Sequence, residues 1–163
     1  MDEEHPLQDR GSEASMSLLK KVKRLKSKDI AQASRTLLDP AIPDPLSEYI
    51  RETPRPDEAG KTLFNLIRDA FGDDAKKMYH IAALATSPDL QGIGCDALVS
   101  AVLKVADAER RSASALAADP IHTEFFQYKG FECVAGTFIG KDEPTWDRPP
   151  VKISLMLRPY KEC

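Results

Sequence analysis

One segment constrains the fold more than any other: an apolar run, a proline turn, a glycine-rich loop and a helical pattern follow one another without interruption. It reads L-A-T-S-P-D-L-Q-G-I-G-C-D-A, from Leu84 to Ala97. A strand that leads into a helix through such a loop gathers backbone N–H groups at the helix N-terminus. The helix dipole adds to their attraction for an anion. The segment therefore predicts a loop that binds a pyrophosphate.

Two familiar phosphate-binding loops do not fit this segment. A dinucleotide fingerprint needs a third glycine after Gly92 and Gly94, but Ala97 stands in its place. A nucleoside-triphosphate loop needs a Gly-Lys pair followed by serine or threonine, and the segment has none. The loop is therefore expected to hold a different phosphate-containing ligand.

The bulk composition is that of a soluble globular protein. The chain has 163 residues and a net charge of −3, with 42% hydrophobic and 30% charged residues. We expect a disordered tail at 1–16 and a single domain at 17–163. The acidic balance argues against nucleic-acid binding, and no apolar run has the length of a membrane span. With a polar, acidic N-terminus, these features predict a cytoplasmic protein, the nucleus being an open alternative.

The cysteines and histidines show no spacing typical of a metal site or a disulfide framework. They are Cys95, Cys133, Cys163, His5, His80 and His122. Cys95 lies in the glycine-rich loop, where a helix N-terminus would lower the pKa of its thiol. A small side chain that fits a crowded loop is the simpler interpretation of this residue.

The hydrophobic pattern predicts an α/β fold. Helices are expected at 29–38, 46–51, 57–71, directly after the glycine-rich loop, and at 120–129; strands are expected at 22–25, 78–86, 112–118, 131–139 and 151–155. The nearly continuous apolar run at 78–86 indicates a central strand buried on both faces. Ile121, Phe125 and Tyr128 are expected to face the core. The sheet is expected to be mixed, mostly antiparallel and flanked by helices.

The strand, loop and helix together resemble the GNAT superfamily of N-acetyltransferases. Its signature is a Gln or Arg, two residues, a Gly, one residue, and a Gly or Ala; Gln91-Gly92-Ile93-Gly94-Cys95-Asp96 follows it up to the last position. The segment 84–99 looks especially like fungal members. F-F-Q-Y-K-G-F-E-C-V at 125–134 and V-K-I-S-L-M-L-R-P at 151–159 resemble the later helix, its turn and the last strand. The resemblance extends over 78–159 and implies a GNAT-like acyl-CoA N-acyltransferase fold.

This resemblance implies a co-substrate and a set of residues that bind it. The co-substrate is acetyl-CoA, and the acceptor is a primary amine of a small molecule or peptide. The positions that correspond to the family's cofactor site are Leu84, Ala85, Thr86, Gln91, Gly92, Ile93, Gly94, Cys95 and Asp96. The strand residues would meet the pantetheine arm through their backbones, and the loop residues would surround the phosphates. Asp96 replaces a small residue, so its carboxylate would repel the phosphates unless it turned outward as a helix N-cap.

The catalytic acid and base are less clearly marked. The family's frequent acid is a tyrosine four residues before the Gly-Phe turn, a position that Phe126 occupies here. Tyr128 is therefore the candidate acid, and His80 on the expected strand is the candidate base. Each also has a structural interpretation, as a packed aromatic residue and as a hydrogen-bonded core histidine. His122 and Glu124 lie nearby in sequence and could act through water.

The family's two antiparallel strands ahead of the cofactor strand have no counterpart at 39–77, where prolines precede a helical pattern. Part of the usual sheet is therefore expected to be missing or supplied by a partner chain, and the exposed edge leaves a homodimer open. The alternative function is a degenerate, non-catalytic acyl-CoA-binding or protein-interaction module. A structural domain whose basic segment 20–28 binds an acidic partner is a third interpretation.

Overall fold

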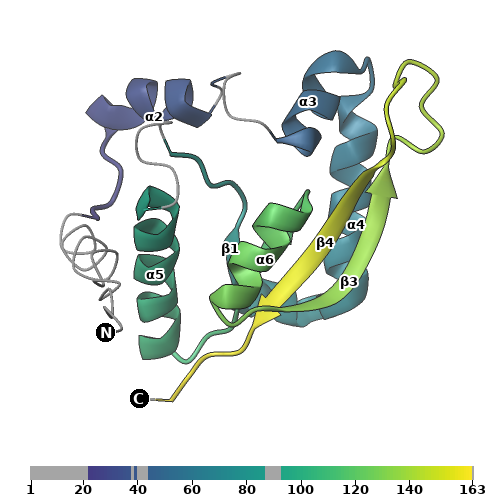
Figure 1. Cartoon of the computed structure of the whole chain (residues 1–163). Coiled ribbons are helices and arrows are strands. Elements are labelled where there is room, and N and C mark those ends of the chain that lie inside the picture. Colours follow the sequence, from purple (N-terminus) through teal and green to yellow (C-terminus); the bar gives the residue numbers. More distant parts are fainter. Residues whose placement is uncertain (1–21, 38, 40–43, 87–92, 163) are drawn as a thin grey trace, which may run out of the picture.

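A four-stranded mixed sheet lies between two layers of helices (Figure 1). The computed structural model describes residues 22–37, 39, 44–86 and 93–162. The strands are β1 (Tyr79–Ile81), β2 (Ala113–Ala117), β3 (Glu132–Ile139) and β4 (Val151–Arg158), in the order β1-β2-β4-β3. β1 is parallel to β2, and the other two pairings are antiparallel. The prediction of an α/β fold with a mixed sheet flanked by helices is confirmed.

Helices lie on both faces of this sheet. The described helices are α2 (Ile30–Leu37), α3 (Pro45–Glu52), α4 (Pro56–Phe71), α5 (Ile93–Ala108) and α6 (Pro120–Tyr128), with short 3-10 turns η1 (Ser27–Asp29) and η2 (Gly72–Lys77). Residues of α5 and α6 pack on one face, and residues of α3 and α4 pack on the other, whereas α2 contributes no residue to the core on either face. Figure 1 shows α6 in front of the sheet and α4 behind it. No described helix combines the length and apolarity that a membrane crossing requires.

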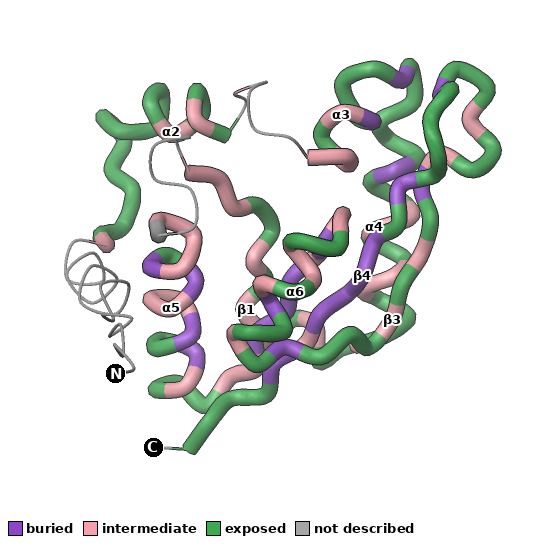
Figure 2. The backbone as a smooth tube through the Cα atoms, viewed as in Figure 1, coloured by how far each residue is buried: buried purple, intermediate pink, exposed green. Residues whose placement is uncertain are grey.

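β4 is the central strand, and its side chains enter two separate cores. The α5/α6 core consists of Val99, Leu103, Ala113, Ala115, Ala117, Phe126, Phe131 and Met156. The α3/α4 core consists of Tyr49, Ala59, Ile139, Trp146, Val151 and Ile153. Because successive side chains of a strand point to opposite faces, one strand can serve both cores. Figure 2 shows the resulting band of buried residues along β4.

Local chemistry sets the helix boundaries that the sequence predicted. The Asp44 carboxylate accepts a hydrogen bond from the Ser47 N–H (2.9 Å) at the start of α3. The Asp119 carboxylate accepts one from the His122 N–H (2.6 Å) at the start of α6. Both helices have a proline in their first turn, where no N–H is needed. Gly72, with φ +52°, ends α4.

The prediction of a strand at 22–25 is wrong. Residues 22–26 are irregular, and 23–26 are exposed. β-branched and apolar residues form a strand only where a neighbouring strand accepts their hydrogen bonds. Within the described ranges, no strand precedes Tyr79. The expected disordered tail at 1–16 lies outside the described residues.

The buried central strand predicted at 78–86 is also wrong. Only Tyr79–Ile81 pairs in the sheet, β1 is an edge strand, and His80 is exposed. The apolar run indicated burial correctly for part of its length, since Tyr79, Ile81 and Leu84 pack against the α5/α6 core. A segment can be buried on one side without pairing in a sheet, and the sequence pattern does not distinguish such a segment from a paired strand.

The core face predicted for α6 is rotated from the observed one. Ile121 and Tyr128 are 75% and 83% exposed, whereas Phe126 is only 4% exposed. The ring of Phe126 meets the rings of Phe125 and Phe131 edge to face, with centroids 5.4 and 5.2 Å away. These aromatic contacts orient the helix, and they depend on Phe131, which follows the helix in sequence.

An aromatic contact attaches the β3–β4 connection to α3. The ring of Trp146 meets the ring of Tyr49 edge to face at 5.1 Å, and its Nε1–H donates to the Pro149 carbonyl (3.0 Å). The Arg148 guanidinium lies 4.3 Å from the Trp146 ring centroid and pairs with the carboxylates of Glu48 and Glu52. This packing leaves room for only a glycine at position 140.

Substitution of Gly140 tests that packing. A Cβ there would lie 2.9 Å from both Trp146 Cδ1 and Tyr49 Cε2, and the backbone has φ +85°. We expect Gly140→Ala to lower the free energy of unfolding by about 2–3 kcal/mol, measured by urea denaturation. Gly60→Ala is the matched control, because its Cβ would meet nothing within 4 Å. It should raise stability by about 0.5–1 kcal/mol; similar losses in both variants would contradict the packing argument.

A buried ion pair joins α5 to β4. Arg158 donates two hydrogen bonds to the Asp107 carboxylate (2.8 and 2.9 Å), and its side chain is 6% exposed. The Lys161 N–H also donates to Asp107 (2.8 Å). The hydrogen bonds from Arg158 lower the pKa of Asp107, although partial burial opposes this. The carboxylate therefore stabilises the fold most in its charged form.

The pH dependence of this pair has a definite sign. Because the pKa of Asp107 is lower in the folded state than its ordinary 3.8, the pair contributes fully above that value and is lost as the pH falls through the folded pKa. We expect Asp107→Asn to lower the unfolding free energy at pH 7 by about 2 kcal/mol. It should also flatten the loss of stability below about pH 4. The exposed Asp147, which has no hydrogen-bond or ion-pair partner among the described residues, gives the matched control: Asp147→Asn should leave the stability at pH 7 unchanged, and an equal loss would refute the assignment.

Candidate functional site

Residues 82–86, which follow β1, do not pair in the sheet. After Ile81, residues 82–86 have no regular structure and make no backbone–backbone hydrogen bond with the described residues. The Thr86 hydroxyl lies 3.5 Å from the Cys95 sulfur in the first turn of α5. Two predicted cofactor residues are thus brought together. Leu84 and Ala85 are half-buried on the same segment.

The glycine-rich loop itself is described only in part. Gln91 and Gly92 lie outside the described residues, as does the side chain of Ile93. Gly94, Cys95 and Asp96 occupy the first turn of α5, which begins at Ile93. The predicted helix is therefore confirmed, but it begins inside the predicted loop, so Gly94 and Cys95 belong to the helix.

β2 continues beyond the point where β1 ends. The last β1 pair is Ile81 with Ala115, but β2 goes on pairing with β4 through Ala117. The Tyr79 N–H donates to the Ser112 carbonyl (2.9 Å), so alternate residues from Ser112 onward direct their backbone groups toward β1. The Leu116 carbonyl therefore points to the side that β1 has left. The pairing of the two parallel strands thus ends at Ile81, and the Leu116 carbonyl lies on the edge of β2 beyond that point.

The start of β1, in contrast, is held firmly. Arg111 Nε donates to the Lys77 carbonyl (2.7 Å), and its guanidinium lies 4.4 Å from the Tyr79 ring centroid. The Tyr79 hydroxyl donates to Glu109 (2.7 Å), and this hydrogen bond raises the pKa of Tyr79. Arg110, with φ +53°, reverses the chain after α5 so that Arg111 meets β1. We call these contacts the β1 clamp.

His80 also attaches β1 to its surroundings through both ring nitrogens, and its role as a catalytic base stays a prediction. Its Nε2 lies 3.0 Å from the Ala75 carbonyl, so that nitrogen carries the proton. Its Nδ1 is hydrogen-bonded to the Ser114 hydroxyl on β2. Both ring nitrogens therefore have hydrogen-bond partners. The Nδ1 lone pair, which a general base would use to take up a proton, already accepts a hydrogen bond from the Ser114 hydroxyl.

Asp96 does not act as an outward N-cap. Its carboxylate forms an ion pair with Lys129, whose Nζ also donates to the Ser100 hydroxyl (2.9 Å). The two charged side chains are 26% and 12% exposed. The negative charge beside the first turn of α5 is thus neutralised by a cation from the turn after α6. The expected repulsion of phosphates is correspondingly reduced.

Tyr128 is not positioned against the predicted strand or loop by any described contact. Its side chain is 83% exposed, and its ring lies 5.7 Å from the Lys129 ammonium. The family's acid position, Phe126, is a buried core residue. The described residues thus bring together the cofactor candidates Thr86, Cys95 and Asp96, but not the acid and base candidates.

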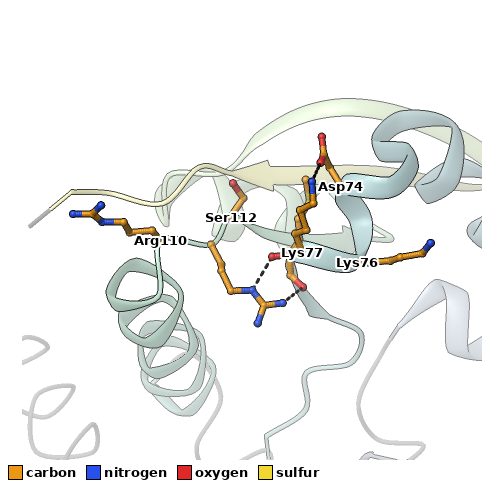
Figure 3. A pocket seen from close by; sticks show the side chains of 7 residues that line it. Asp74, Lys76, Lys77, Arg110 and Ser112 are labelled. Carbon is orange, nitrogen blue, oxygen red and sulfur yellow. Dashed lines mark hydrogen bonds and ion pairs between the residues drawn. The ribbon is translucent and has the colours of Figure 1, made fainter.

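A pocket of about 650 Å³ lies at the other end of β1, beside the β1 clamp (Figure 3). Lysine and arginine side chains dominate its wall, which is formed by Asp74, Lys76, Lys77, Met78, Arg110, Arg111 and Ser112. Lys77 pairs with Asp74 (2.8 Å), and Arg111 is bound to backbone carbonyls. Figure 3 shows Arg110 extending away from Lys77 and Asp74. The pocket thus lies beyond the C-terminal end of α5, whereas Gly94, Cys95 and Asp96 occupy the first turn of that helix.

A second pocket of about 600 Å³ lies between α6, the start of β4 and the β3–β4 connection. Ala118 and Asp119, which directly follow β2, form one wall, and Trp146 and Pro149 form another. Among its carboxylates, Glu48 pairs with Arg148 and Asp119 with His122. Glu124 has no hydrogen-bond or ion-pair partner among the described residues.

The comparisons with known proteins identify no relative. No protein-family model matches the chain, and neither a curated protein nor a solved structure is significantly similar to it. In the part of the chain that the structure describes, no group of three or more histidine, cysteine or acidic side chains could hold a metal ion.

Three residues that shape the site were missed in the sequence. Lys129, Arg111 and Ser114 each act on a partner about 30 residues away, namely Asp96, Lys77 and His80. A single sequence contains no signal for such long-range polar contacts. Only the basic character of Lys129 and Arg111 could have suggested a carboxylate or carbonyl partner.

Removal of Lys129 tests the ion pair beside the loop. Lys129→Met keeps most of the aliphatic side chain but leaves the partly buried Asp96 carboxylate without this cation. We expect the free energy of unfolding to fall by about 1–2 kcal/mol in urea denaturation. Lys104→Met on the exposed side of α5 is the control and should have no measurable effect. Equal stability of the two variants would show that the pair contributes nothing.

Proposed function

We propose that the chain is an N-acetyltransferase that binds acetyl-CoA in the gap between β1 and β2 and transfers the acetyl group to a primary amine. One observation carries this proposal: the pairing of β1 with β2 ends at Ile81, and Thr86, five residues further on, lies beside Cys95 in the first turn of α5. This is the arrangement that the resemblance to GNAT proteins implies, with a strand that diverges from its neighbour before a phosphate-binding loop.

Backbone groups on both sides of the gap suit an amide-containing ligand. Residues 82–86 make no backbone–backbone hydrogen bond with the described chain, and the Leu116 carbonyl points toward the gap. The pantetheine arm contains two amides, which need both donors and acceptors. Leu84, Ala85 and Thr86 would supply these on one side, and Leu116 would supply an acceptor on the other.

The first turn of α5 suits the phosphates of the same ligand. Gly94 and Cys95 lie where a helix N-terminus directs its unpaired N–H groups. Lys129 neutralises Asp96, so the local charge does not oppose an anion. Gln91, Gly92 and Ile93 stay predicted contacts of the phosphates, on the strength of the sequence signature.

The reaction proposed here needs few groups from the protein. Acetyl-CoA would supply an acetyl thioester; a C–N bond to the amine forms, the C–S bond breaks, and the proton lost by the amine balances the one that the thiolate gains. Holding the two reactants together can supply most of the acceleration. The pocket beside Ala118 is the proposed acceptor site, because it adjoins the end of β2 and contains the unpaired carboxylate of Glu124 for a cationic amine.

A non-catalytic acyl-CoA-binding module is the second candidate. It is favoured by the state of the expected catalytic residues: both ring nitrogens of His80 are engaged, and Tyr128 is exposed away from the strand. Release of CoA thiol, followed with a thiol reagent over a panel of primary amines, separates the two candidates. Release that depends on both substrates supports the enzyme; binding without release supports the module.

The proposed phosphate contact predicts the effect of a charge in the first turn of α5. We expect Gly94→Glu to weaken acetyl-CoA binding at least about 100-fold in isothermal titration, because its carboxylate would occupy and repel the phosphate position. Gly60→Glu on α4 makes the same chemical change in open space and should leave affinity unaltered. Unchanged binding by Gly94→Glu would refute the loop assignment, and absence of binding by the unmodified protein would refute both candidates.

A further inference from the structure

β3 is an edge strand whose regular part, residues 135–139, contains no lysine and no proline. It has eight residues, and no described strand pairs with its outer edge. Its residues 133–139 read C-V-A-G-T-F-I and contain no charge and no proline. Val134 and Phe138 are 44% and 57% exposed. Native edge strands are commonly protected by lysine, proline or short length, so this edge is suited to a partner strand.

The sheet register identifies the residues that face this partner. The Tyr79 N–H donates to the Ser112 carbonyl, and along each strand successive residues direct their backbone N–H and C=O groups to opposite neighbours. Followed through β2 and β4, this alternation directs the backbone groups of Ala135 and Thr137 toward β4. Gly136 and Phe138 therefore direct their N–H and carbonyl groups outward. The irregularity in the ladder lies between Cys133 and Ala135, so residues 135–139 form a regular edge.

We propose that two copies of this chain pair through their β3 strands, antiparallel and about a two-fold axis at Thr137. In this register Gly136 lies opposite the partner's Phe138, and Phe138 opposite the partner's Gly136. These are the two outward-facing residues, so each of the two pairs makes two backbone hydrogen bonds. The pairing joins two four-stranded sheets into one continuous sheet of eight strands.

In this register, side chains of one β3 strand meet complementary side chains of the other only if the two strands are identical and antiparallel. Gly136 and Phe138 share the α6 face of the sheet, since their partners on β4 are Ser154 and Lys152. The exposed ring of Phe138 would thus cover the bare backbone of the partner's Gly136, an aromatic–glycine pairing that stabilises sheets. Thr137 would face its own copy, and no like charges would meet along the edge.

The opposite edge of the sheet is less suited to a second copy. β1 pairs over only three residues, and its outward-facing residue is His80. Because the pairing covers only five residues on β3, we expect a small interface and a weak dimer, with a dissociation constant of the order of micromolar. A strand from another protein is the other possible occupant, and the experiment below distinguishes it.

Sedimentation equilibrium of the full chain tests this assignment, from about 1 to 200 μM protein. We expect a concentration-dependent species of about 36 kDa, twice the 18.0 kDa of one chain. Phe138→Lys should weaken association at least about tenfold, because its charge would face the partner strand. Phe64→Lys replaces another exposed aromatic residue, 65% exposed on α4, and should leave association unchanged. A monomer at every concentration would overturn the proposal and leave the edge to a different partner.

A cross-link keeps the test decisive if Phe138→Lys fails to fold. In a Cys133→Ser background, Thr137→Cys places one thiol opposite its own copy across the axis, in a geometry that a disulfide can bridge. Mild oxidation should give a covalent dimer that the background protein without the Thr137 substitution does not form. A dimer in sedimentation without this cross-link would place the interface elsewhere and overturn the proposed register.

Discussion

The asymmetric attachment of β1 determines what the rest of the structure can do. Its start is held by the guanidinium of Arg111, by the Tyr79 hydroxyl on Glu109 and by the ring of His80. At its end the ladder to β2 stops at Ile81, and residues 82–86 make no backbone–backbone hydrogen bond with the described residues. A strand fixed at one end and released at the other must diverge from its neighbour. The divergence exposes backbone polar groups beside the first turn of α5, and the proposed ligand site follows from it.

The remainder of the sheet provides a rigid frame for this opening. β4 is paired on both edges and buried on both faces, and the Asp107–Arg158 pair joins it to α5. The helix that would bind phosphates is thereby fixed to the strand at the centre of the sheet. The proposed pairing through β3 occurs at the opposite edge, so a second copy would enlarge the sheet without covering the gap between β1 and β2.

Local signals in the sequence predicted most elements, and long-range contacts explain the rest. Proline and aspartate at the helix starts, and Gly72 after α4, placed the helices within two residues of their observed ends. Alternation in 151–155 identified β4, although not its central position. The length of β1 could not be predicted, because an apolar run looks the same whether a neighbouring strand or a helix covers it. The face of α6 depends on Phe131, and no periodicity within the helix reports that contact.

In the candidate site, too, local signals predicted one part and long-range contacts explain the other. The loop and the start of α5 follow from glycine spacing, whereas the roles of His80 and Asp96 depend on Ser114 and Lys129, distant in sequence. A histidine on an apolar strand suggested a base, which stays a prediction; the structure adds that its ring joins the strand to β2. An aspartate near a phosphate loop suggested repulsion; the ammonium of Lys129 neutralises it. The findings for His80 and Asp96 both depend on polar partners, which residue types alone do not specify.

The most direct measurement of the central claim is amide hydrogen exchange, by NMR, at the diverging segment with and without acetyl-CoA. The account predicts that the amides of Leu84, Ala85 and Thr86 exchange rapidly in the free protein, because no described backbone group accepts them. Saturating acetyl-CoA should slow at least one of them by about tenfold or more. The amide of Ala115, which the register directs to β4, should not change. Slow exchange of the segment in the free protein, or identical rates with and without the ligand, would contradict the account.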